Sequence, residues 1–126
     1  MLRYLTSGES HGQSLITIID GIPSNIELNI DEINEELKKR QGGYGRGGRM
    51  KIEKDKINII GGVRGKKTIG SPISFEIKNK DFENWVKFMS PMDEIDRESR
   101  IVENVRPGHA DLVGCLKYDF DDARNV

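Results

Sequence analysis

Apolar residues recur in short runs along the first half of the chain, and these runs predict β-strands. Residues 2–7 predict a short strand, and the nearly continuous apolar run Ser14–Asp20 predicts a second. A run that is apolar at most positions is typical of a strand buried on both faces. Farther along, Ile73, Phe75 and Ile77 alternate with polar residues, which predicts a half-buried strand.

The clearest helical pattern covers Ile30–Gln41, and Asn29 and Glu32 have the spacing of a capping box at its start. Three apolar side chains mark one face of this helix: Ile30, Ile33 and Leu37. The next position on that face is Arg40. A cation near a helix C-terminus is one explanation for Arg40. An arginine on an inward stripe also needs an anionic partner or a cleft, so Arg40 is a candidate binding residue.

The remaining pattern is weaker. Residues 50–62 predict a hairpin with a turn near Lys54, and residues 79–105 predict a long loop. A short helix is expected over Asp111–Tyr118. Residues 121–126 begin like a further helix behind an aspartate cap, so we expect the chain to continue beyond Val126. The whole stretch, residues 1–126, reads as a single incomplete domain.

Composition narrows the classes of function. The 126 residues suit one domain, and the net charge of −1 argues against a general nucleic-acid binder. A single cysteine excludes an internal disulfide and a cysteine-rich metal site, and no metal is expected. The start of the chain lacks the apolar core of a signal peptide, and no stretch approaches membrane-spanning length. We therefore expect a cytoplasmic protein with no membrane partner.

The chain has two histidines, and each lies in a turn-like motif. His11 lies in Ser-Gly-Glu-Ser-His-Gly (residues 7–12), and His109 lies in Arg-Pro-Gly-His-Ala-Asp (residues 106–111). Between them residues 42–50 form a glycine track that carries arginines. Histidine exchanges protons near neutral pH, and glycine-rich backbone with arginine binds anionic oxygens. Each histidine alone could be structural, but together the segments predict a site that binds a phosphorylated anion and moves a proton.

These motifs have two alternative interpretations. The glycine–arginine track could be an RG-type nucleic-acid-binding segment, but such segments usually repeat within disordered sequence. Here the track occurs once, between a capped helix and a hairpin, which favours a structured anion-binding loop. A serine nucleophile at Ser10 is disfavoured, because the segment lacks the Gly-x-Ser-x-Gly spacing of a nucleophile elbow.

Four segments together resemble the chorismate synthase family: Gly-Glu-Ser-His-Gly (8–12), Arg-Gln (40–41), Tyr-Gly-Arg-Gly-Gly-Arg-Met (44–50) and Arg-Pro-Gly-His-Ala-Asp (106–111). The resemblance implies a carbon–oxygen lyase of the shikimate pathway of aromatic amino-acid biosynthesis. That enzyme converts 5-enolpyruvylshikimate 3-phosphate to chorismate and phosphate by a 1,4-anti elimination. It needs reduced FMN, with NADPH in members that reduce their own flavin.

The resemblance also implies roles for single residues. His11 would protonate the departing phosphate, and His109 would lie beside the flavin and protonate N1 of the reduced ring. Substrate-binding positions are implied for five residues: Ser10, Arg40, Arg46, Arg49 and Arg106. Two of these, Arg40 and Arg46, also match positions linked to NADP.

For the fold, the resemblance implies an α/β protein of the α+β type, in which a helical layer lies between antiparallel sheets. It also implies assembly as a homotetramer. The chain would supply the N-terminal third of that sandwich, and we expect this third to be inactive by itself.

Overall fold

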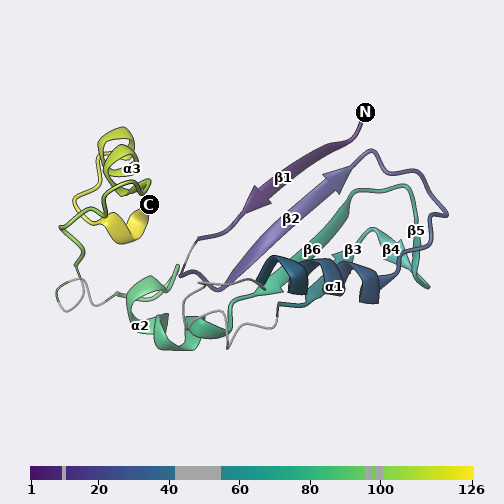
Figure 1. Cartoon of the computed structure of the whole chain (residues 1–126), viewed down its shortest axis with the longest axis horizontal. Helices are drawn as coiled ribbons and strands as arrows, with labels where there is room; N and C mark the ends of the chain where they lie inside the picture. The colour runs from purple at the N-terminus through teal and green to yellow at the C-terminus, as the bar shows by residue number, and fades with distance from the viewer. Residues whose placement is uncertain (10, 42–54, 96–97, 99–100) are drawn as a thin grey trace. The chain divides into compact units, whose positions relative to one another are not determined.

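The computed structural model describes residues 1–9, 11–41, 55–95, 98 and 101–126. The chain forms two compact units, Met1–Glu83 and Asn84–Val126, whose elements are labelled in Figure 1. Each unit is described by itself below.

The first unit is built on a four-stranded antiparallel sheet of β1 (Arg3–Ser7), β2 (Ser14–Asp20), β3 (Ile57–Gly61) and β6 (Ile73–Lys78). The strand order is β1-β2-β6-β3, and all three pairings are antiparallel. The sequence predictions for β1, β2 and β6 are therefore confirmed, to within one residue at the start of β1. Together with the helices, this sheet confirms the expected mixed α/β class.

A two-residue hairpin joins β4 (Val63–Arg64) to β5 (Lys67–Thr68). Its turn residues, Gly65 and Lys66, have φ angles of 54° and 64°, which suit a turn that needs positive φ at both positions. The hairpin expected over residues 50–62 is described only in part. Its second arm is β3, which pairs with β6, and its first arm lies outside the described residues, as does the predicted turn residue Lys54.

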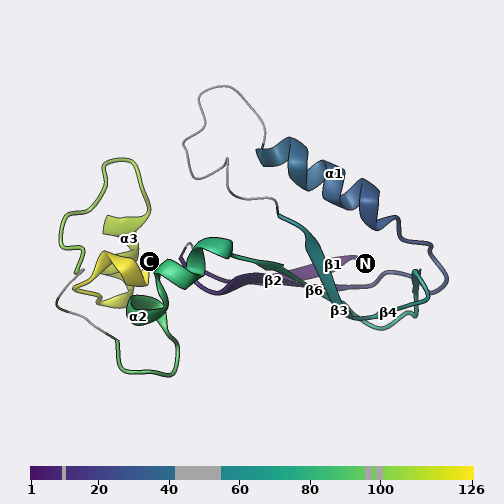
Figure 2. The same ribbon diagram turned by 90° about the horizontal axis from the view of Figure 1, so that it is seen from below.

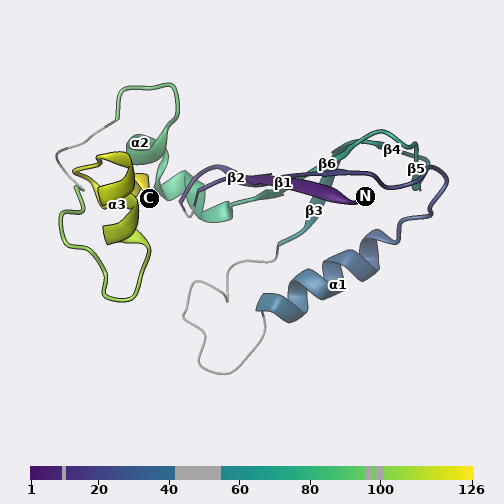
Figure 3. The ribbon, with the colours of Figure 1, turned by 90° about the horizontal axis from the view of Figure 1, so that it is seen from above.

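The expected burial of β2 on both faces is wrong for this chain. Leu15, Ile16 and Ile18 keep 39–43% of their surface exposed. β1 and β6 flank β2 through backbone hydrogen bonds, which satisfy the edges of a strand but cover neither face. Figures 2 and 3 show helix α1 (Ile30–Gln41) along one side of the sheet, and it packs against β3.

Helix α1 has the predicted bounds and the predicted cap. The side-chain oxygen of Asn29 accepts hydrogen bonds from the backbone N–H groups of Asp31 (3.1 Å) and Glu32 (3.3 Å). The Glu32 carboxylate accepts from the Asn29 side-chain amide at 2.8 Å, where a serine or threonine box would use the backbone N–H. Asparagine thus closes the same reciprocal pair with its own side chain.

The second unit is mainly short helices. The region predicted as a long loop holds a 3₁₀ helix, η2 (Lys80–Asn84), which spans the boundary between the units, and α2 (Val86–Met89). The rings of Trp85 and Phe88 meet edge to face, 6.5 Å apart. Helix α3 (Asp111–Tyr118) has the predicted bounds. The helix expected from residue 121 is a 3₁₀ turn, η3 (Ala123–Asn125), capped by Asp122. Over the described residues, the helices are too short or too polar to cross a membrane.

Candidate functional site

The segment before α3 folds around one carboxylate. Asp111, in the first turn of α3, is fully buried. Its Oδ2 accepts from the Arg106 Nε at 2.9 Å and from the Arg106 backbone N–H at 3.0 Å, and its Oδ1 accepts from the Arg106 Nη2 at 2.9 Å. The planar guanidinium fork matches both carboxylate oxygens, so the two side chains hold each other in a fixed orientation.

His109 belongs to the same cluster. Its Nδ1 is hydrogen-bonded to Oδ1 of Asp111 and lies 3.2 Å from Nη2 of Arg106. The preceding residue, Gly108, has a φ of 73°, a conformation that other residues rarely adopt. The His109 side chain keeps 46% of its surface exposed, so the ring is anchored at one nitrogen and still open to a ligand.

The electrostatics of this cluster follow from its hydrogen bonds. The Arg106 side chain, followed by the Arg106 backbone N–H, holds the pKa of Asp111 far below its ordinary value, although burial opposes the shift. In return, the hydrogen bond to Asp111 raises the pKa of Arg106. Asp111 is therefore an ionised, acceptor-only group near neutral pH.

His11 lies in the turn between β1 and β2, which is tied down on both sides. The Asn79 side-chain amide donates to the Gly12 carbonyl at 2.8 Å, and the Asn79 backbone N–H donates to the Gln13 carbonyl at 3.0 Å. At the other side, Gly8 has a φ of 143°, and a Cβ there would come within 2.8 Å of the Ser14 carbonyl oxygen. The turn that carries His11 is thus fixed to the end of β6 and needs glycine at its entry.

The structure places the predicted site residues unevenly. Arg106 and His109 are brought together in the second unit, and His11 belongs to the first unit. Arg40 lies in the last turn of α1. The other predicted residues lie outside the described part of the chain: Ser10, Arg46 and Arg49. Convergence of His11 and His109 on one pocket stays a prediction.

Sequence reasoning assigned no role to Asp111, the residue that organises the described cluster. Its signal was its position inside the motif of residues 106–111, next to a histidine and an arginine with which a carboxylate can pair. The residue also opens a helix, where an acidic side chain has an ordinary explanation in the helix dipole. That explanation hides the role of the carboxylate in holding His109.

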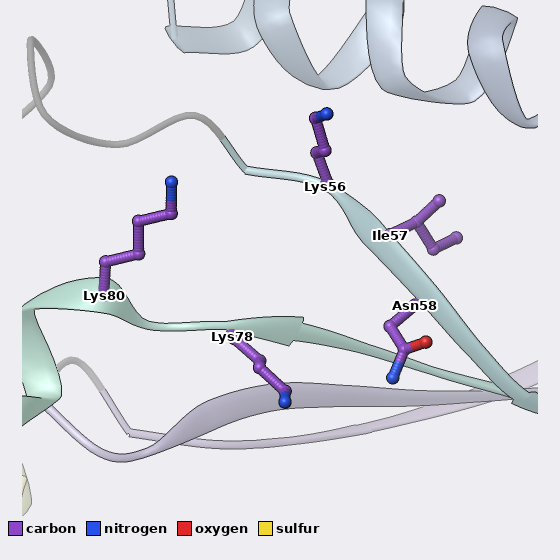
Figure 4. A pocket seen from close by; sticks show the side chains of 5 residues that line it. All are labelled: Lys56, Ile57, Asn58, Lys78 and Lys80. Atoms are coloured by element: carbon purple, nitrogen blue, oxygen red, sulfur yellow. The ribbon is translucent and has the colours of Figure 1, made fainter.

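A cavity of about 530 Å³ lies at the end of β3 and β6. Figure 4 shows the three lysine side chains on its lining: Lys56, Lys78 and Lys80. Among the described residues, Ile57 and Asn58 also line the cavity, and the candidates His11, Arg106 and His109 do not. Its basic lining attracts anions in general, but no sequence motif marks it.

The fold and the cluster define a mixed α/β protein with a candidate proton-exchange site. Residues 2–126 match the family model for chorismate synthase, and the chain belongs to that family. It is 60% identical to the chorismate synthases of Alkaliphilus metalliredigens, over all of this chain and 33% of that protein, and of Syntrophotalea carbinolica, over 99% of this chain and 32% of that protein. The chain thus spans about a third of the length of the curated relatives it matches.

Solved structures give the same result. A crystal structure of chorismate synthase superposes with a TM-score of 0.67 and 40% sequence identity, over 98% of this chain and 27% of the other. These matches confirm the family that the four motifs indicated. They agree with the enzyme interpretation and not with the RG-type nucleic-acid-binding alternative.

Proposed function

We propose that the protein acts as a chorismate synthase, converting 5-enolpyruvylshikimate 3-phosphate to chorismate and phosphate by a 1,4-anti elimination with reduced FMN. The observation that carries this proposal is the match of residues 2–126, nearly the whole chain, to the family. The described cluster at His109 supports it, because the reaction needs a histidine held beside a bound reactant.

The negative charge of the substrate accounts for the number of arginines among the candidate site residues. The substrate carries a phosphate and two carboxylates, and guanidinium groups bind such oxygens in pairs while staying charged. Substrate contacts are proposed for Ser10, Arg40, Arg46, Arg49 and Arg106. Arg106 differs from the others, because its Nε and Nη2 already donate to Asp111. Its Nη1 remains for the substrate, and Asp111 offsets much of its charge.

His11 is proposed as the proton donor to the departing phosphate. A proton delivered to the leaving oxygen lowers the charge that builds up as the C–O bond breaks. Asn79, at the end of β6, holds the backbone that directly follows His11, which ties this part of the turn to the sheet.

His109 is proposed to hold a proton at N1 of the reduced flavin. The cluster fits that role, because Asp111 engages one ring nitrogen of a half-exposed imidazole and leaves the other for the ligand. Reduced FMN supplies reducing equivalents that are returned within the same turnover, so no net electrons are consumed. Arg40 and Arg46 are proposed to contact NADPH as well, should the protein reduce its own flavin.

The direct test is turnover by the full-length protein. Anaerobic incubation with reduced FMN and 5-enolpyruvylshikimate 3-phosphate is expected to raise the chorismate absorbance and release phosphate. Residues 1–126 alone are expected to form no product under the same conditions. Absence of product with the full-length protein and fully reduced FMN would reject the proposal. We further propose a cytoplasmic homotetramer, which sedimentation of the full-length protein would check.

A further inference from the structure

The proposed reaction does not say which ring nitrogen of His109 carries the fixed hydrogen, and the fully buried carboxylate of Asp111 beside the ring answers this question. We propose that Asp111 is a positioning residue for His109: its carboxylate accepts a hydrogen bond from the Nδ1–H group, so that Nε2 is the ring nitrogen that exchanges a proton during the reaction. The tautomer rests on the contacts and the charge of Asp111, whereas the proton exchange rests on the proposed function.

The geometry decides which ring nitrogen carries the fixed proton. Nδ1 of His109 has two polar neighbours, Oδ1 of Asp111 and Nη2 of Arg106. An unprotonated Nδ1 would direct its lone pair at a carboxylate oxygen in hydrogen-bond contact, which is repulsive. Nη2 of Arg106 could donate its second hydrogen to an unprotonated Nδ1 at 3.2 Å, but this contact is longer than the contact between Nδ1 and Oδ1, so the repulsion from the carboxylate outweighs it. A protonated Nδ1 instead donates to that oxygen.

The negative charge of Asp111 excludes the other possible direction of the hydrogen bond between Asp111 and His109. A protonated Asp111 could donate to Nδ1 and reverse the hydrogen bond. The hydrogen bonds from the Arg106 side chain and backbone hold the pKa of Asp111 far below neutrality, so the carboxylate accepts only. Arg106 therefore acts on His109 through Asp111, by fixing both its orientation and its ionisation.

This arrangement has one chemical consequence. In the neutral imidazole, one nitrogen carries a hydrogen and the other accepts. With the Nδ1 hydrogen committed to Asp111, Nε2 alone gains and loses a proton, whichever direction the proton moves. A carboxylate that holds a histidine in one tautomer is a recurring device of catalytic sites.

The variant Asp111→Asn tests this sharply, because Arg106 dictates how an amide would sit. With its oxygen at the Oδ2 position, the amide accepts from both the Nε and the backbone N–H of Arg106. Its NH₂ group then faces His109 and needs an acceptor there. We expect Nδ1 to lose its hydrogen and Nε2 to gain it, which reverses the tautomer.

The experiment uses full-length protein with ¹⁵N-labelled histidine, and long-range ¹H–¹⁵N correlation reports the tautomer of the neutral ring. His109→Gln assigns the resonance. The native protein is expected to show a protonated Nδ1 and an unprotonated Nε2, and D111N the reverse. D111N is also expected to lower turnover by about 10²–10⁴-fold with substrate binding kept. Asp111→Glu, which retains a carboxylate, should recover part of the loss.

Asp122→Asn is the matched control. Asp122 is a buried carboxylate in the same unit and, like Asp111, accepts from an arginine: its Oδ2 accepts from the Arg124 Nε at 2.7 Å. D122N is expected to leave the His109 tautomer and turnover unchanged.

The possible outcomes distinguish the positioning of His109 by Asp111 from the proposed function of the whole protein. A native His109 protonated at Nε2 when neutral would overturn the proposal, and this measurement needs no variant to fold. A reversed tautomer in D111N with normal turnover would overturn the proton-exchange role. If the native tautomer is as expected but the protein forms no chorismate, the proposed function fails and the positioning of His109 stands.

Discussion

Asn34 of α1 and Ile57 of β3 are joined by a hydrogen bond of 3.0 Å, in which the Asn34 side-chain oxygen accepts from the Ile57 backbone N–H. These residues lie on either side of the segment that carries Arg46 and Arg49. The hydrogen bond therefore fixes the distance between the two elements from which that segment departs.

The substitution Asn34→Ala removes the acceptor and leaves a part-buried backbone N–H without it. We expect the free energy of unfolding to fall by about 1 kcal/mol. We also expect a higher substrate dissociation constant in the full-length protein, because α1 and β3, which flank the candidates Arg46 and Arg49 in the sequence, lose this connection. Denaturant titration and equilibrium binding measure the two effects.

Asn58→Ala is the control for Asn34→Ala, since the Asn58 amide makes an exposed side-chain hydrogen bond to Glu76 on the neighbouring strand. It is expected to change stability by less than about 0.5 kcal/mol and to leave substrate binding as it was. Equal binding losses in both variants would contradict the role given to Asn34.

Thr68 organises the connection between β2 and α1. Its side chain is 2% exposed, and its hydroxyl donates to the Pro23 carbonyl at 2.6 Å and accepts from the Ile26 backbone N–H at 2.9 Å. Thr68→Val keeps the shape but leaves both backbone groups without this partner, so we expect a loss of about 1–3 kcal/mol in stability. Thr68→Ser keeps the hydroxyl and should retain most of that stability. Similar denaturation midpoints for the two variants would contradict this account.

Local signals predicted the elements that local interactions determine. The bounds of α1 follow from the Asn29 cap and those of β2 from its apolar run, and both were read from the sequence. The pairing of β3 with β6 was not predicted from the sequence, because the β4–β5 hairpin separates the two strands in the chain. The burial of β2 was predicted wrongly, since burial depends on what covers a sheet and not on the strand itself.

Only part of the candidate site could be predicted, because the sequence shows residue types and spacing but not contacts in space. Residue type and the glycine before it identified His109 as a candidate, and the family resemblance added Arg106. The role of Asp111 required geometry, since only the fold shows that one carboxylate accepts from Arg106 and contacts His109 at once. The roles of Ser10, Arg46 and Arg49 stay predictions from the sequence and the family.

His11→Ala tests proton donation to the leaving group. We expect turnover by the full-length protein to fall about 10²–10⁴-fold while the substrate dissociation constant changes little, because the proton is needed only as the C–O bond breaks. Steady-state turnover and equilibrium binding separate the two quantities. A turnover number near that of the native protein would remove His11 from the mechanism.

Arg49→Ala is expected to change mainly the substrate dissociation constant, whereas His11→Ala changes mainly turnover. Removal of one guanidinium from a polyanionic substrate is expected to raise the dissociation constant by about 10–100-fold, as charged hydrogen bonds contribute roughly 1.5–3 kcal/mol. Arg49→Lys keeps the charge but loses the planar fork, and an intermediate dissociation constant is expected. An unchanged dissociation constant in Arg49→Ala would argue against substrate contact at this position.

The pH dependence of stability tests the Asp111 clamp independently of activity. Hydrogen bonds from Arg106 lower the pKa of Asp111 from its ordinary value of 3.8. A carboxyl whose folded pKa is depressed stabilises the fold above its unfolded pKa, and this stabilisation is lost as the pH falls through the folded pKa. The difference in unfolding free energy between native protein and D111N should therefore be constant above about pH 5 and shrink below about pH 4. Denaturant titrations across this range measure the difference. A gap that stays constant down to the lowest pH at which the protein folds would show that Arg106 does not stabilise the ionised carboxylate.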